Sequence, residues 1–309
     1  MTTVYMNPVL AACLLKAAPK LGSVNWQAHN AQQIALLAEL PEIKRLLAAM
    51  PAGMLDSIGS TSAGSFHARH IGSAGRYSAS NAATAARSML GSSAAHAPIF
   101  SSASRSATTV FSTFAVLDIL TKWQVPGKAT KIYVERKPYP AVEMKGENIQ
   151  VTTANGVEVV EPLTDTLKGD SRVLIVQADS LETGLAALRA PRAPVADKIA
   201  GVQFPMVDLN VLVDIDWLVG LTHESGSRLT KAVAQAKLRL DHLGAHAKAG
   251  AAIVVSRSMS GPRTIVIDKP FVVAFMVADQ IAVAFHVGPA DWKKPPNLGE
   301  KGSVAGETW

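Results

Sequence analysis

The spacing of apolar residues changes along this 309-residue chain, and that change narrows the range of folds more than any other feature. In Pro8–Ala18, Ala31–Leu40 and Glu42–Met50 the apolar residues recur at helical intervals. From Val110 onward the chain is rich in short runs of β-branched and aromatic residues, which are typical of strands. Helices followed by strands, without a repeated alternation of the two, indicate an α+β fold.

Several elements can be assigned along the chain. Ser180 is a plausible cap for a short amphipathic helix over Ser180–Ala190, and another helix is expected to begin near Asp214–Asp216 and to carry Trp217. Pro41 either begins a new helix or bends the preceding one, because it lacks a backbone N–H. The expected strands are Lys131–Glu135, Ile149–Thr153, Val157–Val160, Val173–Gln177, Ala251–Val255, Thr264–Ile267, Phe271–Val277 and Ile281–Val287.

The composition of the segment 54–109 differs from that of the rest of the chain, since serine, alanine and glycine dominate it. We favour a partly ordered surface structure for this segment. A flexible linker and a functional basic face remain alternatives. The basic residues scattered through it are Arg69, Arg76, Arg87 and Arg105.

Neither long apolar stretch favours a membrane-inserted protein. Pro8–Ala18 resembles a signal-peptide core, but no basic residue precedes it and Lys16 interrupts it. Phe271–Val287 is broken by Asp279 and Gln280, which indicates two strands and a tight turn. We therefore expect a soluble chain without a membrane span. Its compartment stays open between the cytoplasm and export by a non-classical route.

The charge balance is basic, with a net charge of +6 and an isoelectric point near 9.4. Such a balance suits acidic partners, so a polyanion such as heparin is a possible partner. No run of five or six basic residues occurs, and a mildly basic surface without a specific partner is the simpler interpretation. Cys13 is the single cysteine, which excludes a disulfide within the chain.

The sequence gives no positive sign of catalysis. It lacks the motifs GxSxG, GxGxxG and HExxH, and it has no P-loop. His67 and His70 have no cysteine or carboxylate nearby at the spacing of metal ligands. Asp208, Asp214 and Asp216 lack the glycine and the distal glutamate of a calcium loop. We expect neither an enzyme nor a bound metal or cofactor.

Several motifs in the second half of the chain stand in a recognisable order. The tetrapeptide at Asp268–Phe271 (DKPF) is followed by VVAFMVADQIAVAF, and Lys237–Phe271 reads KLRLDHLGAHAKAGAAIVVSRSMSGPRTIVIDKPF. Weaker motifs lie upstream at Val159–Leu188, Phe111–Trp123 and Val4–Leu15. Together with the interval from the glycine at 244 to the proline at 270, these motifs resemble the serpin family over about 4–40 and 110–290.

The resemblance implies one serpin-like α+β domain over 1–309, in which 54–109 matches the family poorly. Its architecture would be N-terminal helices, a large mixed central sheet, smaller C-terminal sheets and an exposed reactive loop, in a monomer. The hinge of the loop would be Gly244 with the alanines that follow at alternate positions, Ala245, Ala247, Ala249 and Ala251. Trp123 would stand at the top of the central sheet, and Pro270 and Phe271 would be structural.

The resemblance also implies a suicide mechanism against a serine protease. Cleavage of the loop frees the hinge, which enters the central sheet as a new strand and drags the bound protease with it. Small residues would face inward, while His246 and Lys248 would face outward. An ordinary amphipathic strand or helix is the alternative for this stretch. We favour Arg257–Ser258 as the scissile bond, for a trypsin-like protease, over Ser258–Met259.

Some positions depart from the family pattern. His242 and Leu243 stand where acidic residues usually precede the hinge glycine, and Ala234 replaces a histidine that latches the central sheet. Asn7 and Leu10 replace two serines at the start of the first helix. These departures leave two functions open, a covalent protease inhibitor and a non-inhibitory structural or binding protein. The eroded pattern would fit a viral or other fast-evolving copy.

Overall fold

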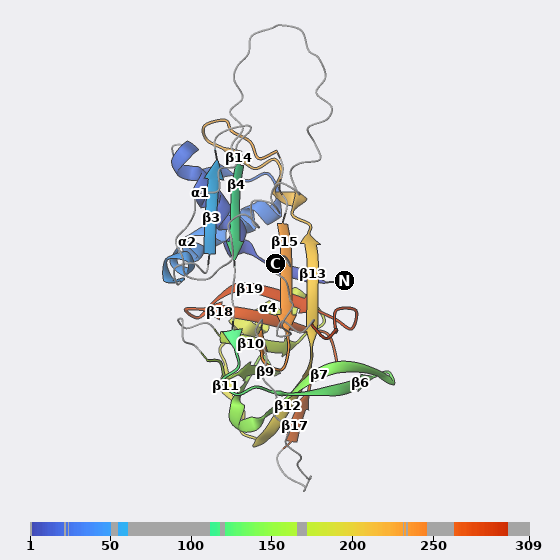
Figure 1. Cartoon of the computed structure of the whole chain (residues 1–309). Helices are drawn as coiled ribbons and strands as arrows, with labels where there is room; N and C mark the ends of the chain where they lie inside the picture. Colours follow the sequence, from blue (N-terminus) through green and yellow to red (C-terminus); the bar gives the residue numbers. More distant parts are fainter. Residues whose placement is uncertain are drawn as a thin grey trace.

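The computed structural model describes residues 2–21, 23, 25–50, 55–60, 112–117, 121–165, 172–230, 232, 234–245 and 263–295 (Figure 1). The expected α+β fold is confirmed, because helices cluster near the N-terminus and strands predominate in the later described segments. The helices are α1 (Asn7–Leu21), α2 (Ala31–Ala49) and α4 (Leu181–Arg189), with short 3-10 turns η2 (Gly146–Asn148) and η3 (Asp216–Leu218).

The largest sheet has seven strands in the order β1-β19-β18-β10-β9-β8-β11, and all its pairings are antiparallel. Its central strand is β10, and in the neighbouring strand β18 every residue is buried because both faces are covered. The strands are β1 (Thr3–Tyr5), β8 (Ile149–Ala154), β9 (Val157–Pro162), β10 (Arg172–Gln177), β11 (Ala193–Pro194), β18 (Phe271–Val277) and β19 (Gln280–Val287).

A second sheet has four strands in the order β17-β12-β7-β6. Its strands β17 (Arg263–Val266) and β12 (Ile199–Pro205) form the parallel pair of the sheet. The strands β7 (Lys137–Lys145) and β6 (Lys128–Val134) form a hairpin at its edge. The segment 246–262 comes immediately before β17 in the sequence and lies outside the described residues.

The remaining strands form antiparallel pairs rather than one large mixed sheet within the described residues. The pairs are β13 (Val207–Val213) with β15 (Ala234–Leu240), β3 (Leu55–Ser60) with β4 (Ser112–Leu117), β5 (Thr121–Lys122) with β16 (Gly244–Ala245), and β2 (Trp26–Gln27) with β14 (Thr222–His223). In the view of Figure 1, β3–β4 and β13–β15 run along the long direction of the molecule, and β18 and β19 cross that direction.

The helices α1 and α2 pack on each other, and α1 also packs on the pair β3–β4. Pro8 lies in the first turn of α1, as expected. Pro41 lies inside a continuous α2, so it neither begins a new helix nor ends the old one. The helix expected near Asp214–Asp216 is wrong: the chain makes only the turn η3 there, and the carbonyl of Trp217 accepts a hydrogen bond from buried Gln33.

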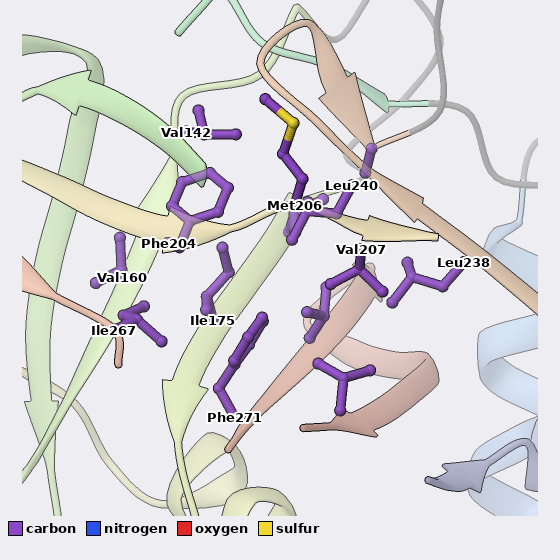
Figure 2. Packing of buried hydrophobic residues seen from close by; sticks show 14 of the residues in the cluster. Val142, Val160, Ile175, Phe204, Met206, Val207, Leu238, Leu240, Ile267 and Phe271 are labelled. Carbon is purple, nitrogen blue, oxygen red and sulfur yellow. The ribbon is translucent and has the colours of Figure 1, made fainter. Parts of the chain in front are cut away.

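Most of the core lies where the two larger sheets and the β13–β15 pair meet. Figure 2 shows Phe204 of β12, Ile175 of β10 and Phe271 of β18 close together, and each is fully buried. Leu238 and Leu240 of β15 belong to the same cluster. The C-terminal end of β15 is therefore anchored in the core. On the other face of the seven-stranded sheet, α4 packs against β10, β18 and β19, with Ser180 as its cap.

Among the described segments, α1 and α2 included, no helix has both the length and the apolar character needed to cross a membrane.

Candidate functional site

The chain reverses direction just after β15. The backbone N–H of Asp241 donates to the carbonyl of Gly244 at 3.0 Å, which closes a tight turn over His242 and Leu243. Asp241 Oδ1 accepts hydrogen bonds from the N–H groups of Leu243 at 2.8 Å and Gly244 at 3.2 Å. The aspartate therefore satisfies donors that the turn itself leaves without a backbone acceptor.

After this turn, β16 pairs antiparallel with β5, with Gly244 opposite Lys122 and Ala245 opposite Thr121. The N–H of Trp123 donates to the carbonyl of Leu243 at 3.1 Å, which extends this pairing by one residue. Successive residues of a strand direct their backbone groups to opposite sides. Gly244 therefore bonds toward Asp241, at the end of β15, while its neighbours bond toward β5. The strand β16 lies between the end of β15 and β5.

Gly244 is required at this position by the close approach of two backbones. A Cβ atom added there would collide with the carbonyl oxygen of Thr121 and would lie 2.9 Å from Cα of Lys122. Ala245, the next residue, is fully buried in the core cluster. A small side chain thus enters the core as soon as the chain has turned.

Trp123 fixes the turn to the core. Its Nε1–H donates to the carbonyl of Asp241 at 2.8 Å, and its ring meets Phe204 edge to face at a centroid distance of 6.3 Å. Only 3% of Trp123 is exposed. On the side away from β16, the N–H of Asp165 donates to the carbonyl of Lys122 at 2.8 Å. The tryptophan therefore links the turn, β5 and the four-stranded sheet.

The outer face of β15 is basic. Lys237 and Arg239 stand on it, and Arg239 Nε donates to Asp208 Oδ1 of β13 at 3.2 Å. Burial, and after it the charge of Arg239, lowers the pKa of Lys237 from its ordinary value. Within the described residues β15 pairs along its length with β13 only, so its other edge meets a strand only where β16 begins.

The strand β17, which follows the segment 246–262, is attached to its neighbours by ion pairs. The guanidinium of Arg263 forms ion pairs with Glu158 of β9 and with Asp197. The carbonyl of Pro270 accepts a hydrogen bond from Ala178 N–H at 3.1 Å. Phe271 is fully buried, and the centroid of its ring lies 6.2 Å from that of Trp292. The segment 246–262 is therefore attached at one end to the buried strand β16 and at the other to β17, which pairs with β12 and is held by the ion pairs of Arg263.

The predicted residues fall into three groups. The structure brings Trp123, Gly244 and Ala245 together at the turn. Phe271 lies in the core as the first residue of β18, and half-buried Pro270 directly precedes it. The other predicted positions, Ala247, Ala249, Ala251, Arg257, Ser258 and Met259, lie outside the described residues.

Sequence reasoning missed Asp241, whose side chain shapes the turn. A signal was present, because aspartate at the first and glycine at the last position of a four-residue turn is a common pattern. It also missed Thr121, which no motif distinguishes, and it named His242 only as a departure from the family pattern. Thr121 Oγ1 and His242 Nδ1 are buried and have no hydrogen-bond partner. Among the described residues, no three histidine, cysteine, aspartate or glutamate side chains gather in a way that would hold a metal ion.

No protein-family model matches this chain, and no curated protein matches it in sequence. Solved structures do match. Human thyroxine-binding globulin complexed with thyroxine is 12% identical and has a TM-score of 0.51, over 93% of this chain and 91% of that one. SRPN18 from Anopheles gambiae is 11% identical and has a TM-score of 0.50, over 96% and 93%.

Serpin48 from the insect Tenebrio molitor, described as a highly specific serpin, matches over a shorter stretch. It is 17% identical, has a TM-score of 0.42 and aligns with 59% of this chain. This chain covers 57% of the length of Serpin48.

Proposed function

Because the chain has the serpin fold, we propose that it is a serpin-type inhibitor of a serine protease that traps its target by loop cleavage and strand insertion. The observation that carries the proposal is the position of β16. The two residues that follow the turn already lie between the end of β15 and β5, antiparallel to both. A strand that continued in this direction would lengthen β16 along the edge of β15.

The register of β16 gives a specific pairing for the proposed insertion. With Gly244 opposite Asp241, the residues 246–251 would pair in reverse order with 239–234 of β15. Every second residue would then lie on the same face as buried Ala245. On β15 that face carries Ala236, Leu238 and Leu240, all buried. The residues proposed to enter beside them are Ala247, Ala249 and Ala251.

The energetics favour insertion once the loop is cut. Each added residue can gain about 1 kcal/mol of net hydrogen bonding. Burial of Ile253 and Val255 would add roughly 1.5–3 kcal/mol for each side chain. Before cleavage the same segment is attached at both ends, to β16 and to β17, where Arg263 is held by ion pairs. The uncut protein would thus be protected by a kinetic barrier, and not by equilibrium stability.

We propose Arg257–Ser258 as the scissile bond, since the acidic pocket of a trypsin-like protease pairs with arginine. Ser258–Met259 is the alternative, and it would suit a chymotrypsin-like or elastase-like protease. Replacing Arg257 by alanine separates the two. The change should abolish reaction with trypsin if Arg257 is the recognised residue, and it should leave reaction with chymotrypsin intact if Ser258–Met259 is cleaved.

The direct test is incubation with trypsin followed by a denaturing gel. A complex that survives boiling and contains both chains would support covalent trapping. Clean cleavage in the region of Arg257 without a complex would contradict it. Heat resistance of the cleaved protein is the second readout, because insertion should raise the melting temperature markedly and an unchanged midpoint would count against insertion.

A matched pair of variants tests the direction of the side chains. Ala247→Asp would bury a carboxylate in the proposed inserted strand, whereas Lys248→Asp places the same group on the outer face. The first variant should turn the inhibitor into a substrate that trypsin cleaves without forming a complex. The second should still form it. Equal behaviour of the two variants would overturn the proposed strand.

A second candidate function is that of a non-inhibitory binding or structural protein with the same fold. Ala234 favours it, because this buried position of β15 carries no side chain able to latch the sheet by a hydrogen bond. The absence of acidic residues just before the hinge glycine, where His242 and Leu243 stand, favours it as well. Cleavage without a complex and without a gain in heat resistance would select this function.

A further inference from the structure

Within the described part of the chain, β6 is the terminal strand of the four-stranded sheet, and its outer edge pairs with no other strand. Its hairpin with β7 closes at the pair Val134 and Lys137, so the backbone groups of Val134 bond toward β7. By alternation, the N–H and carbonyl groups of Ala129, Lys131 and Tyr133 point outward. Among the described residues no strand pairs with them.

The two prolines of β7 support this assignment. Pro138 stands opposite Tyr133, and Pro140 stands opposite Lys131. A proline has no N–H to give to a neighbouring strand, so it fits the positions at which the β6 backbone faces away from β7. The carbonyl of Pro140 accepts from Met206 N–H at 2.9 Å, which confirms that its polar group faces away from β6.

The side chains around this edge are basic. Lys128, Lys131, Arg136 and Lys137 are all exposed, and the acidic side chains of the hairpin are Glu135 and Glu143. Glu143 already faces Lys128 at 3.9 Å. Tyr133 is 70% exposed and stands on the same face as Lys131, beside the outward-facing backbone. Tyrosine and arginine are the residue types that most often anchor protein interfaces.

We infer that the edge of β6 accepts an extended, acidic segment of a partner protein as an added strand. Main-chain hydrogen bonds would supply the pairing, and carboxylates at alternate positions would meet Lys131 and the neighbouring lysines. A second copy of this chain is disfavoured as the added strand, because the lysines of the two β6 strands would lie next to each other and repel. This inference does not depend on insertion of the loop and goes beyond the inhibitory function.

The probe is a fluorescently labelled, capped peptide that alternates valine and glutamate over the length of β6. Its binding to the full-length chain is measured by anisotropy, with a valine–lysine peptide as the charge control. The glutamate peptide should bind with an affinity that falls as salt rises, and the lysine peptide should not bind. Amide hydrogen exchange should slow at Ala129, Lys131 and Tyr133 when the glutamate peptide binds.

Two substitutions at one position separate charge from strand pairing. Lys131→Ala removes the charge and should weaken binding roughly fivefold. Lys131→Pro also removes an N–H that points outward, while it leaves the bonds to β7 intact, and should weaken binding further. Lys44→Glu, on the exposed face of α2, is the control for net charge and should bind nearly as well as the unchanged protein.

Several outcomes would overturn the inference. If Lys131→Ala and Lys131→Pro lost the same share of peptide affinity, and heparin bound the same residues, the hairpin would be a site for polyanions. It would then not be an acceptor of an added strand. Protection of β15 instead of β6 would place the peptide at the other open edge. The absence of binding at millimolar peptide, or equal binding of the lysine peptide, would exclude an acidic partner strand.

Discussion

At the scale of single residues, Gly244 has the most restrictive environment of the candidate site. Its backbone lies against Thr121 and Lys122, and the turn before it is held by Asp241 and Trp123. Each of these residues acts through a specific contact, so each can be tested by one substitution. A substitution of Gly244 tests the close approach of the strands, and a substitution of Trp123 tests the attachment of the turn to the core.

Gly244→Ala should lower the free energy of unfolding by about 1–3 kcal/mol, because the added methyl group forces two strands apart. The effect is measured by urea unfolding of the uncut protein. Gly288→Ala is the matched control, since a Cβ atom at Gly288 meets nothing within 4 Å. If both variants lost a similar free energy of unfolding, the contact with β5 would not be the reason for a glycine at position 244.

A second residue-scale prediction concerns Tyr5. Its hydroxyl donates to Glu39 at 3.0 Å, and Arg189 lies over its ring at 5.3 Å. Burial, followed by the charge of Glu39, raises the pKa of Tyr5 well above its ordinary value of 10.0. The neutral form is therefore favoured in the folded state. This contribution to stability is complete below pH 10 and is lost as the pH rises toward the folded pKa.

Tyr5→Phe removes both the hydrogen bond and the titration. At neutral pH the variant should be about 1 kcal/mol less stable. Above pH 10 the difference from the unchanged protein should shrink, because only the unchanged protein must keep a tyrosine protonated. Urea unfolding at pH 8 and pH 11 gives the comparison, and a difference that stays constant would contradict the raised pKa.

At the scale of elements, three hairpins use two-residue turns whose residues all have positive φ. Asn155 and Gly156 join β8 to β9, with φ of 52° and 78°. Ala278 and Asp279 join β18 to β19, with φ of 46° and 61°, and Glu135 and Arg136 join β6 to β7, with 50° and 66°. Only the first pair consists of residues that favour this conformation. Pairing of the long strands therefore imposes the other two turns.

Exchanging the turn residues tests this explanation. Ala278→Asn should stabilise the protein by up to about 1 kcal/mol, and Asn155→Ala should destabilise it by a similar amount, because asparagine tolerates positive φ and alanine does not. Thermal unfolding of the two variants measures the effect. Both positions are turn residues between paired strands, so each substitution changes the same backbone preference in opposite directions. Changes of the same sign in both variants would contradict the explanation.

At the scale of the whole molecule, the proposed insertion would carry an electrostatic cost. If the pairing of Gly244 with Asp241 were continued along β15, Lys248 would arrive opposite Lys237, whose pKa is already lowered by burial. Like charges directly opposite each other in a sheet destabilise it. The basic outer face of β15 would therefore oppose completion of the strand.

Lys248→Glu should stabilise the cleaved protein by about 0.2–1 kcal/mol relative to the cleaved unchanged protein, and salt should weaken the gain. Thermal unfolding after trypsin cleavage, at low and high salt, measures it. Lys44→Glu controls for net charge. A gain of the same size in the uncut variant would show that Lys248 acts before insertion.

Much of this architecture could be predicted from local patterns. The strand pair over Phe271–Val277 and Ile281–Val287 is confirmed, with its turn at Ala278–Asp279, because a continuous apolar run broken by polar residues is a local signal. The helix expected near Asp214–Asp216 was wrong: the chain forms only the turn η3 there, and the carbonyl of Trp217 accepts a hydrogen bond from Gln33 of α2. The residues Lys237–Phe271 also predicted the serpin fold, which the structural comparisons confirm.

The sequence by itself determined roughly where α1, α2 and α4 lie and where the strands β6, β8, β9, β10, β17, β18 and β19 lie, because their apolar pattern is contained within each segment. Only the tertiary structure decided that Asp241, Trp123 and Gly244 meet, that β16 turns back between β15 and β5, and that β6 is the terminal strand of its sheet among the described residues. These contacts join residues far apart in the chain. Their energies depend on how the sheets pack, and no local pattern records that packing.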